Sequence, residues 1–545
     1  MRRLLERNTI LKNWTKVDLR ICLYYPSTYE SGILSLALQM LYGLFNERED
    51  VLCERSFDNI YPRGISIESH RKLNKFDVLA FTIHNELDLS KCVEVLELLG
   101  IPVYSKDRNP REYPILIAGG PVAFQNPSPI SPIFDAIFIG EVEDVYNQLL
   151  DALKVAKDTG SLEALAEVPG LYVPIHSEKR VRRVYTKDLD ESFYPLRQFI
   201  PVDIKVAFGP SFLLEINRGC GYGCRFCLAG FIYRPPRMRS MKRILEILDI
   251  GLKQSGVNSV SLISLAMVDH PQIVDILEEI CDRNLRVSIP SLRLDALSED
   301  VIKLIRKSGQ RSITVAPEVA TVNLANSINK GIYPDDLFEL CRIARSYGFR
   351  KIKLYFMIGF PGETLKDVME IGRLIRKIKE SGFQRVTVTI NPFIPKPHTP
   401  LQWAPFESIK NILEKEDVIL RSLKSTSGVK VEFLNWKFAY SETFLARAPE
   451  EAHSVILEVA HRGVRTVSSW HRAISKYIGK YGRILEKPLQ GYELEDELPW
   501  DIVDIGISKS YLRYEYEKYF SGEITESCYS RCSNCGICPL GKSFP

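Results

Sequence analysis

The chain has 545 residues, of which 45% are hydrophobic and 26% charged, and 72 basic against 68 acidic residues give a formal charge of +4. This balance is typical of a globular protein of about three domains, and it excludes a disordered chain, a collagen-like repeat and a strongly basic nucleic-acid coat. The longest apolar stretch, residues 32–45, is shorter than the roughly 18 residues that a membrane span requires, and it predicts a buried helix. The N-terminus lacks the apolar core of a secretory signal, so we expect a cytoplasmic protein.

The first 150 residues alternate strand and helix signals. An amphipathic helix is predicted at residues 90–100, and strands are predicted at 17–25, 76–83, 113–118 and 136–139. Short apolar strands separated by helices predict a mostly parallel sheet with helices on both faces. Gly119-Gly120-Pro121 and Gly140-Glu141 each follow a strand, at the edge where such sheets bind ligands, although a simple tight turn also explains them.

From residue 211 the alternation restarts. Strands are predicted at 212–217, 259–265, 286–290, 312–316, 351–357 and 385–393. Helices are predicted between them at 241–254, 271–284, 298–307, 334–347 and 364–381. Six strands are too few for an eightfold barrel and predict a partial (β/α)6 barrel, with its chemistry at the carboxyl ends of the strands.

The predicted fold class is therefore α/β, with a Rossmann-like N-terminal domain, a partial barrel and a mostly helical C-terminal region. The charged segment 177–195 predicts a linker or hairpin between the first two. We expect the domains at residues 1–176, 211–398 and 399–545, with the linker at 177–210.

Seven of the 12 cysteines fall in two groups: Cys220, Cys224 and Cys227, then Cys528, Cys532, Cys535 and Cys538. Clustered thiols in a cytosolic chain indicate metal or redox chemistry rather than a disulfide framework. The other five are scattered in apolar surroundings and are expected to be buried as small hydrophobic residues: Cys22, Cys53, Cys92, Cys281 and Cys341.

The first group directly follows the first predicted barrel strand, in the sequence Asn217-Arg218-Gly219-Cys220-Gly221-Tyr222-Gly223-Cys224-Arg225-Phe226-Cys227. Three thiolates this close in sequence can surround one iron–sulfur cluster, and the glycines let the backbone wrap closely around it. A [4Fe–4S] cluster normally takes four cysteines, so three leave one iron open to a ligand from outside the protein. A zinc knuckle is the alternative, but it lacks a nearby fourth ligand.

This C-x3-C-x2-C spacing, with the aromatic Phe226 before the last cysteine, resembles the signature of the radical S-adenosylmethionine (SAM) superfamily. The resemblance implies that the open iron chelates the amino and carboxylate groups of SAM. It also implies that one electron from the cluster cleaves the sulfonium, which releases methionine and a 5′-deoxyadenosyl radical that abstracts substrate hydrogen. A one-electron reductant such as ferredoxin or flavodoxin is the implied partner.

Two further positions fit that resemblance. Glu318 follows the fourth barrel strand, where relatives contact the ribose or amino acid part of SAM, although a helix N-terminal acid is an equal alternative. Gly359, in the loop after the fifth strand, resembles the family's loop beside adenine, and a plain turn also explains it. The Gly-Gly-Glu often found after the second strand is replaced by Ser264-Leu265-Ala266. Asp269-His270 is either a catalytic pair or, as we favour, a helix cap.

The N-terminal domain resembles the cobalamin-binding domain that many such enzymes carry, on the recurring pieces Ile117–Pro121, Asn126-Pro127 and Ile139-Gly140-Glu141. The Asp-x-His-x-x-Gly signature that supplies a cobalt-ligating histidine is absent, and His84 lacks that context. We therefore favour a cobalamin-type fold without cobalamin, while a cobalamin cofactor stays open. Nearly the whole chain resembles an uncharacterised radical SAM family with such a domain. This resemblance implies the type of reaction but does not indicate the substrate.

The C-terminal run Cys528-x3-Cys532-x2-Cys535-x2-Cys538-Pro539 offers four thiolates in one short stretch. Closely spaced cysteines followed by proline are typical of iron–sulfur ligation, whereas zinc usually uses two separated knuckles. We predict an auxiliary [4Fe–4S] cluster at these four residues, with zinc or a purely structural site as the alternatives.

The leading hypothesis is a radical SAM enzyme that abstracts hydrogen from an unknown substrate. The alternatives are a cobalamin-dependent radical SAM methyltransferase and a non-enzymatic iron–sulfur or RNA-binding protein. RNA is one candidate substrate, because the basic segments 179–183 and 234–239 could contact phosphates, although solvated charge is the default interpretation of both. Lipids and small metabolites stay open.

Overall fold

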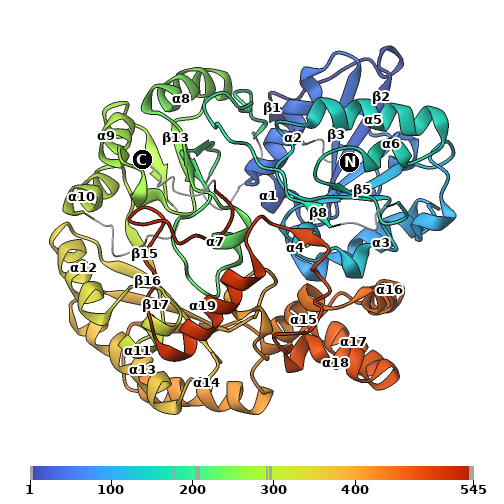
Figure 1. Cartoon of the computed structure of the whole chain (residues 1–545). Helices are drawn as coiled ribbons and strands as arrows, with labels where there is room; N and C mark the ends of the chain where they lie inside the picture. Colours follow the sequence, from blue (N-terminus) through green and yellow to red (C-terminus); the bar gives the residue numbers. More distant parts are fainter. Residues whose placement is uncertain (1–3, 177–179, 203–208, 290–292, 294–297, 539–545) are drawn as a thin grey trace.

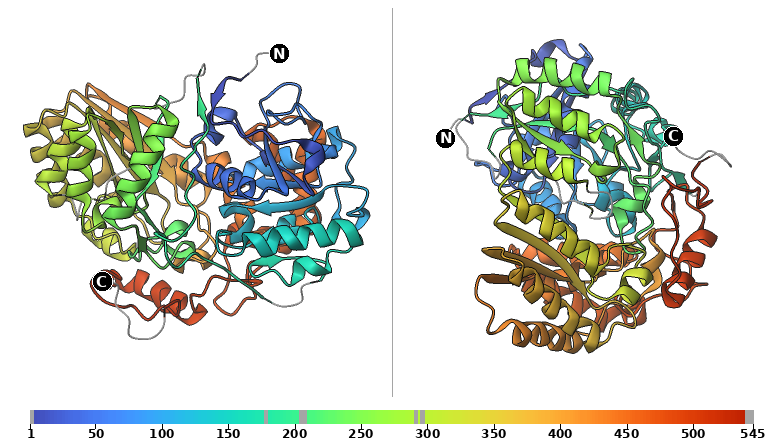
Figure 2. Two further views of the ribbon diagram at one scale, coloured as in Figure 1. Left: turned by 90° about the horizontal axis from the view of Figure 1, so that it is seen from above. Right: turned by 90° about the vertical axis from the view of Figure 1, so that its left-hand side faces the viewer.

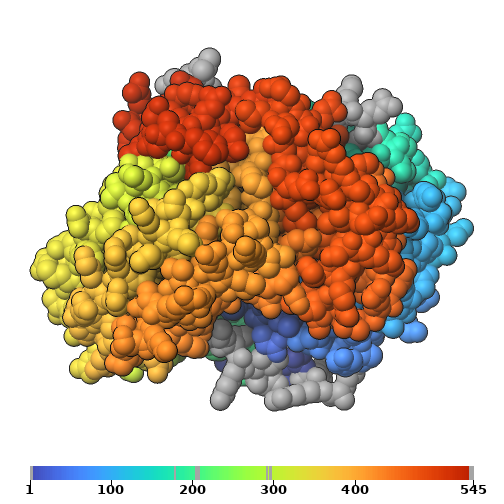
Figure 3. Space-filling view, turned by 90° about the horizontal axis from the view of Figure 1, so that it is seen from below, coloured from blue at the N-terminus to red at the C-terminus, as the bar shows by residue number. Residues whose placement is uncertain are grey.

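The computed structural model covers the whole chain, and it describes every residue except 1–3, 177–179, 203–208, 290–292, 294–297 and 539–545. An N-terminal α/β lobe and a barrel-like lobe lie side by side (Figure 1). The C-terminal helices pack beneath the first lobe, and the last helix, α19 (Lys509–Ser521), crosses the second. The view from below shows the C-terminal region as one continuous surface that reaches from the barrel to the N-terminal lobe (Figure 3).

The N-terminal lobe is built on a six-stranded sheet in the order β3-β2-β4-β5-β6-β7. All neighbours are parallel except β6 and β7. The strands are β2 (Leu19–Tyr25), β3 (Val51–Phe57), β4 (Val78–Thr82), β5 (Ile115–Gly119), β6 (Ala136–Phe138) and β7 (Leu171–Tyr172). The Rossmann-like topology and the predicted strands and helix of this domain are confirmed.

Both faces of this sheet are apolar, which is why it needs cover on both sides. One face packs against α2 (Leu36–Glu47), α5 (Tyr146–Thr159) and α6 (Glu163–Ala166). The other packs against α3 (Leu89–Leu98) and α4 (Pro121–Gln125), and this core continues into the C-terminal helices. Those helices are α15 (Trp436–Arg447), α16 (His453–Arg462), α17 (Val467–Tyr481) and α18 (Arg483–Gln490).

Strand β3 was not predicted, because the charged residues Glu54 and Arg55 interrupt its apolar run. Both are buried in the structure. Arg55 donates to Glu68 Oε1 (2.7 Å) and to Glu6 Oε2 (2.6 Å), so a buried ion-pair network compensates the charge within the strand.

The barrel lobe holds two parallel sheets. The first contains β10 (Phe212–Glu215), β13 (Ser259–Ile263) and β14 (Arg286–Ser288); the second contains β15 (Ser312–Glu318), β16 (Lys351–Ile358), β17 (Arg385–Pro392) and β18 (Val429–Phe433). The outer helices are α8 (Met241–Ser255), α9 (Ile273–Asp282), α10 (Glu299–Lys307), α12 (Pro334–Ser346), α13 (Leu365–Glu380) and α14 (Ile409–Leu423). Figure 2 shows these helices around the outside of the strands.

All six predicted barrel strands and the five predicted helices are confirmed. Strand β18 is a seventh and pairs in parallel with β17, so the barrel continues past residue 398, where we expected the C-terminal region to begin. Only half-buried or exposed side chains line β18, which explains why its apolar signal is weak.

The predicted linker, residues 177–210, supplies one strand to each of two small sheets, and the first of these strands lies in the segment 177–195. Strand β8 (Val181–Arg182) pairs with β19 (Val503–Asp504), and β9 (Ile200–Pro201) pairs antiparallel with β1 (Glu6–Arg7). The hairpin prediction is therefore wrong, because the partner strands come from the two ends of the chain. The remaining short elements are α1 (Tyr29–Gly32), β11 (Asn217–Arg218), α7 (Leu228–Ile232), β12 (Arg237–Met238) and α11 (Val322–Ser327).

The five scattered cysteines are buried, as predicted. No helix among the described residues is long and apolar enough to cross a membrane.

Candidate functional site

Residues 220–227, here called the first cysteine loop, lie beyond the carboxyl end of β10. The stem β11 pairs antiparallel with β12, and α7 begins directly after Cys227. Gly219, at the base of the loop, has φ +83°, and a Cβ atom there would lie 2.4 Å from the carbonyl oxygen of Tyr233. Only glycine lets the chain turn this tightly into the loop.

The three thiols of this loop are enclosed and close enough to affect one another. Burial, followed by the thiols of Cys224 and Cys227, raises the pKa of Cys220 to about 12. Burial and then Cys224 raise the pKa of Cys227. Nη1 of Arg293 lies 3.4 Å from Sγ of Cys224. Arg293 places positive charge beside these thiols, which favours their thiolate forms.

Glu318, predicted to bind the cofactor, forms an ion pair with Lys330 (3.2 Å) close to the same thiols. Its φ of +69° is unusual for a residue other than glycine, and it occurs where β15 ends. Burial raises the pKa of Glu318, while Lys330 and Arg293 oppose that change. Sequence reasoning missed Arg293 and Lys330, because nothing in their local sequence shows that the fold carries them to the cysteines.

Phe226 and Gly359, the other two predicted cofactor-binding residues, lie on neighbouring loops. The ring of Phe360 stands edge-on to Phe226 (6.1 Å) and stacks on Phe393 (4.6 Å). Gly359 has φ +92°, and its N–H donates to Oε2 of Glu363 (2.6 Å). The fold thus brings the loop after β16 against the aromatic residue of the cysteine loop.

The turn after β13 supports the first cysteine loop from another side. Nδ2 of Asn217 donates to the carbonyl of Ala266 (2.8 Å), and the hydroxyl of Tyr222 donates to Asp269 (2.6 Å). His270 is buried, where its Nδ1 accepts from the N–H of Gln272 (3.2 Å) just before α9. The N-cap residue of α9 is Gln272, and no side chain caps the helix, so the helix-cap prediction for Asp269-His270 is wrong; Asp269 faces the loop.

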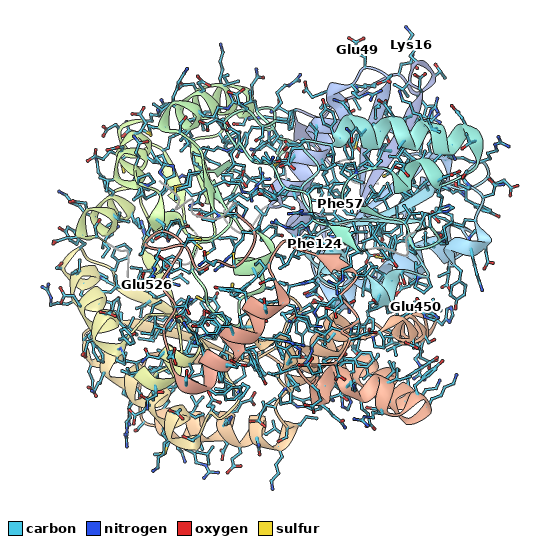
Figure 4. The ribbon with its side chains drawn as sticks, in the orientation of Figure 1. Lys16, Glu49, Phe57, Phe124, Glu450 and Glu526 are labelled. Carbon is cyan, nitrogen blue, oxygen red and sulfur yellow. The ribbon has the colours of Figure 1, made fainter. Side chains whose placement is uncertain are left out.

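A chamber of about 420 Å³ connects the N-terminal sheet with the first cysteine loop. Its inner part is apolar and lies between the sheet and helices α2 and α5; it is lined by Ile21, Val78, Ile117, Phe138, Leu149 and Leu153. Its outer part is lined by the loop stem, Asn217 to Gly219, and by the end of β13. Phe124 of α4, labelled in Figure 4, also lines the chamber, and its ring lies 6.1 Å from that of Tyr233.

Part of the chamber lining lies at the carboxyl ends of the sheet strands, the edge where such sheets bind ligands. Gly119, Gly120 and His84 lie there. Arg218 Nη1 donates to Glu141 (2.8 Å) and to Glu143 (2.6 Å) across the junction between the two lobes.

The C-terminal cysteine segment, residues 528–538, lies directly on the first cysteine loop. The N–H of Cys528 donates to the carbonyl of Gly221 (2.8 Å). Glu526, just before this segment, lies against the barrel lobe in Figure 4. The two cysteine groups, 301 residues apart at their closest in sequence, are neighbours in space. Across the described residues, no three or more cysteine, histidine or acidic side chains converge tightly enough to hold a single metal ion.

The basic segment 234–239 fits neither of its two interpretations, solvated charge or phosphate contact. Arg234, Arg237 and Arg239 are all buried. Arg237 pairs with Glu141 (2.7 Å) across the junction between the lobes, and Arg239 pairs with Glu215 (3.0 Å) within the barrel lobe. In the other segment Arg183 is buried, Arg180 and Arg182 are exposed, and Lys179 lies outside the described residues.

Comparison with known sequences identifies the family. Residues 214–375 match the model of the radical SAM superfamily, and residues 37–174 match that of the N-terminal region of radical SAM proteins. The uncharacterized protein MJ0966 of Methanocaldococcus jannaschii is 31% identical over 470 residues, which is 86% of this chain and 97% of the relative. The chain belongs to the radical SAM superfamily.

Two other comparisons are more distant. An uncharacterized methyltransferase, PH0819 of Pyrococcus horikoshii, is 25% identical and matches over 50% of this chain and 60% of its own. The radical SAM methyltransferase TsrM of Kitasatospora setae has 13% identity and a TM-score of 0.52 over 85% of this chain and 99% of that one. This likeness to TsrM shows a shared fold.

As a member of the radical SAM superfamily, the chain is an enzyme that uses SAM and a [4Fe–4S] cluster, as predicted. The non-enzymatic alternative is therefore set aside. Such an enzyme needs a one-electron reductant and a substrate.

Proposed function

We propose that Cys220, Cys224 and Cys227 ligate the catalytic cluster and that the fourth iron position binds SAM. The observation that carries this proposal is the group of three thiols, one buried and two half-buried, beside Arg293 at the carboxyl end of the first barrel strand. When bound, the cluster and SAM supply a 5′-deoxyadenosyl radical for hydrogen abstraction. The donor set fits this group, because a loop with three cysteines leaves one iron position free.

The surrounding side chains have separate tasks in this proposal. Arg293 and Lys330 offset the negative charge of the thiolates, while Glu318 accepts a hydrogen bond from SAM. Phe226 and Phe360 wall off one side of the site with aromatic surface. By filling space with apolar groups they exclude water that would quench a radical.

The chamber supports a substrate with a substantial apolar part. Its inner lining is aliphatic and aromatic, and its outer end meets the stem of the first cysteine loop. A phosphate-rich RNA finds no basic lining there apart from Arg218, which already pairs with Glu141 and Glu143. RNA is therefore the less favoured substrate class, and a ferredoxin or flavodoxin is the proposed electron donor.

The test is SAM cleavage by anaerobically reconstituted protein. Wild type is expected to form 5′-deoxyadenosine and methionine when a reductant is added, and Cys224→Ala is expected to form none. Cys341→Ala, which alters a buried cysteine in α12, is the matched control and should retain activity. Formation of 5′-deoxyadenosine by Cys224→Ala would refute the ligand assignment.

A cobalamin-dependent methyl transfer is the second candidate, and the chamber is the observation that favours it. A cavity that opens at the carboxyl ends of a parallel sheet and extends between sheet and helices suits a cofactor with a bulky face and an apolar tail. Hydroxocobalamin should then bind with a change in its visible spectrum. Ala80→Phe, which narrows the chamber from β4, should abolish that uptake while SAM cleavage persists. Absence of any uptake by wild type would remove this candidate.

A further inference from the structure

The four C-terminal thiols line a compact cavity of about 30 Å³ together with Arg234, Pro235 and Pro236. Cys528 and Cys535 are buried, and Cys532 and Cys538 are half-buried. The four thiols therefore face one shared space.

Arg234 carries an unfulfilled hydrogen-bond donor at this cavity. Its Nε donates to the carbonyl of Gly230 (2.9 Å) and its Nη2 to that of Tyr222 (2.8 Å). Its Nη1 is buried and makes no hydrogen bond of normal length among the described groups, although the guanidinium also interacts with the hydroxyl of Tyr511. A buried unpaired N–H is costly, so the cavity calls for an occupant with acceptor atoms.

The same arginine ties this cavity to the first cysteine loop, because its two satisfied nitrogens bind backbone carbonyls in and just after that loop. The N–H of Gly221 also donates to the hydroxyl of Tyr529 (3.3 Å), and the rings of Tyr222 and Tyr529 lie 5.6 Å apart. A Cβ atom on Gly221 would lie 2.7 Å from the Tyr529 ring. The loops that carry the two cysteine groups are therefore in direct contact.

The chemistry of the occupant follows from these features. Four thiolates with C-x3-C-x2-C-x2-C-P spacing match iron–sulfur ligation. The sulfides and thiolates of such a cluster accept hydrogen bonds, which satisfies Nη1 of Arg234. The guanidinium also offsets the net negative charge of the cluster.

We propose that Cys528, Cys532, Cys535 and Cys538 hold a second [4Fe–4S] cluster, hydrogen-bonded by Arg234, that passes single electrons toward the first cysteine loop. A complete set of four protein ligands leaves no iron open, so this site transfers electrons and does not bind SAM. One electron enters from an external one-electron donor protein and one leaves, with no bond made or broken. Asn534 and Gly536 are exposed at this site, which gives such a donor access.

The assignment of these four cysteines as ligands does not depend on the proposed function. Two half-site variants, each lacking cysteines of one group, test the two ligand assignments separately. Anaerobically reconstituted wild type should hold about eight iron atoms per chain, and both Cys532→Ala/Cys535→Ala and Cys220→Ala/Cys224→Ala/Cys227→Ala about four. If only the first-loop assignment is wrong, the triple variant keeps the iron content of wild type. Zinc without sulfide in the triple variant, or unchanged iron in the double variant, would overturn the second cluster.

Electron paramagnetic resonance tests the contact between the sites and the role of Arg234. Two reduced clusters this close should broaden each other's signals, and each half-site variant should remove the broadening. Arg234→Lys should make the second cluster about tenfold harder to reduce, or about 59 mV for one electron, because the lost donor stabilised the reduced form.

Arg447→Lys is the matched control for that substitution. Arg447 is buried with two unpartnered nitrogens of its own and lies over the ring of Tyr492, so its substitution perturbs the core without reaching the cysteines. The role of Arg234 would be refuted if the second cluster had the same reduction potential in wild type, Arg234→Lys and Arg447→Lys. It would also be refuted if both substitutions shifted that potential equally. If the paramagnetic resonance spectrum of wild type equals the sum of the spectra of the two half-site variants, the proposed electron path is refuted.

Discussion

The first cysteine loop places three thiols at the end of a barrel strand, between Arg293 and Lys330 and beside a large chamber. The C-terminal segment places four thiols around a small cavity near the surface, with one arginine behind them. On our proposals, cysteine has a different role in each group. Three ligands beside a chamber would leave one iron position for a small molecule, while four ligands around a small cavity would leave room only for the metal group.

The largest expected difference between the sites is in SAM cleavage. Cys224→Ala should abolish formation of 5′-deoxyadenosine with any reductant, because it removes a ligand of the cluster that holds SAM. Cys532→Ala should slow the reaction most when a donor protein supplies the electrons, and much less with a small chemical reductant. Side-by-side assays with both kinds of reductant measure this. Equal losses in the two variants would erase the functional distinction between the sites.

The second prediction tests the ion pair between Lys330 and Glu318 beside the first cysteine loop. Lys330→Met should weaken SAM binding about 10- to 100-fold, because it leaves the largely buried Glu318 carboxylate without its partner. Lys330→Arg keeps the charge and should retain most of the affinity. Equilibrium dialysis with SAM gives the comparison, and unchanged affinity in Lys330→Met would show that the pair is unimportant for the cofactor.

A smaller effect concerns the contact between the two sites. Gly221→Ala places a methyl group against the Tyr529 ring and should lower the free energy of unfolding by about 1–3 kcal/mol. Gly479→Ala is the matched control, since nothing lies within 4 Å of its added Cβ in helix α17. That substitution should raise stability by about 0.5–1 kcal/mol. Denaturant titration distinguishes them, and equal changes would show that the segment is not seated on Gly221.

The smallest effect isolates one hydrogen bond at the same contact. Tyr529→Phe removes the hydroxyl that accepts from the N–H of Gly221 but keeps the ring. We expect a loss of about 0.5–1.5 kcal/mol in stability, with the iron content unchanged. Thermal unfolding together with iron analysis checks both expectations; a loss of iron would mean that this tyrosine also organises the cluster.

Much of the fold could be predicted, because strands and helices in the barrel follow simple periodic patterns. Strand β16 alternates buried and less buried side chains along its length, and α13 begins at a capping box formed by Thr364 and Asp367. Local sequence patterns fail to predict a strand where a buried charge is paired with residues that are distant in the sequence. Arg55 lies in a buried strand because Glu6 and Glu68 meet it there, and neither is adjacent in sequence.

The cysteines of the candidate site could be recognised from their spacing in the sequence. The charged residues that surround them in the fold could not. Arg234, Arg237 and Arg239 have the sequence appearance of a solvated basic patch, yet each is enclosed by carboxylates or carbonyls from other elements. Lys330 and Arg293 reach the thiols from two separate loops. Such convergence depends on the tertiary fold, which no short window of sequence contains.

The packing of α16 on α3 has a consequence for how the chain folds during synthesis. The N-terminal lobe leaves the ribosome hundreds of residues before the helices that complete its apolar core. In that interval the outward surface of α3 is uncovered and can associate with other nascent chains. A fragment that stops at the end of the barrel should consequently aggregate or recruit chaperones, and adding the missing helical region in trans should rescue its solubility.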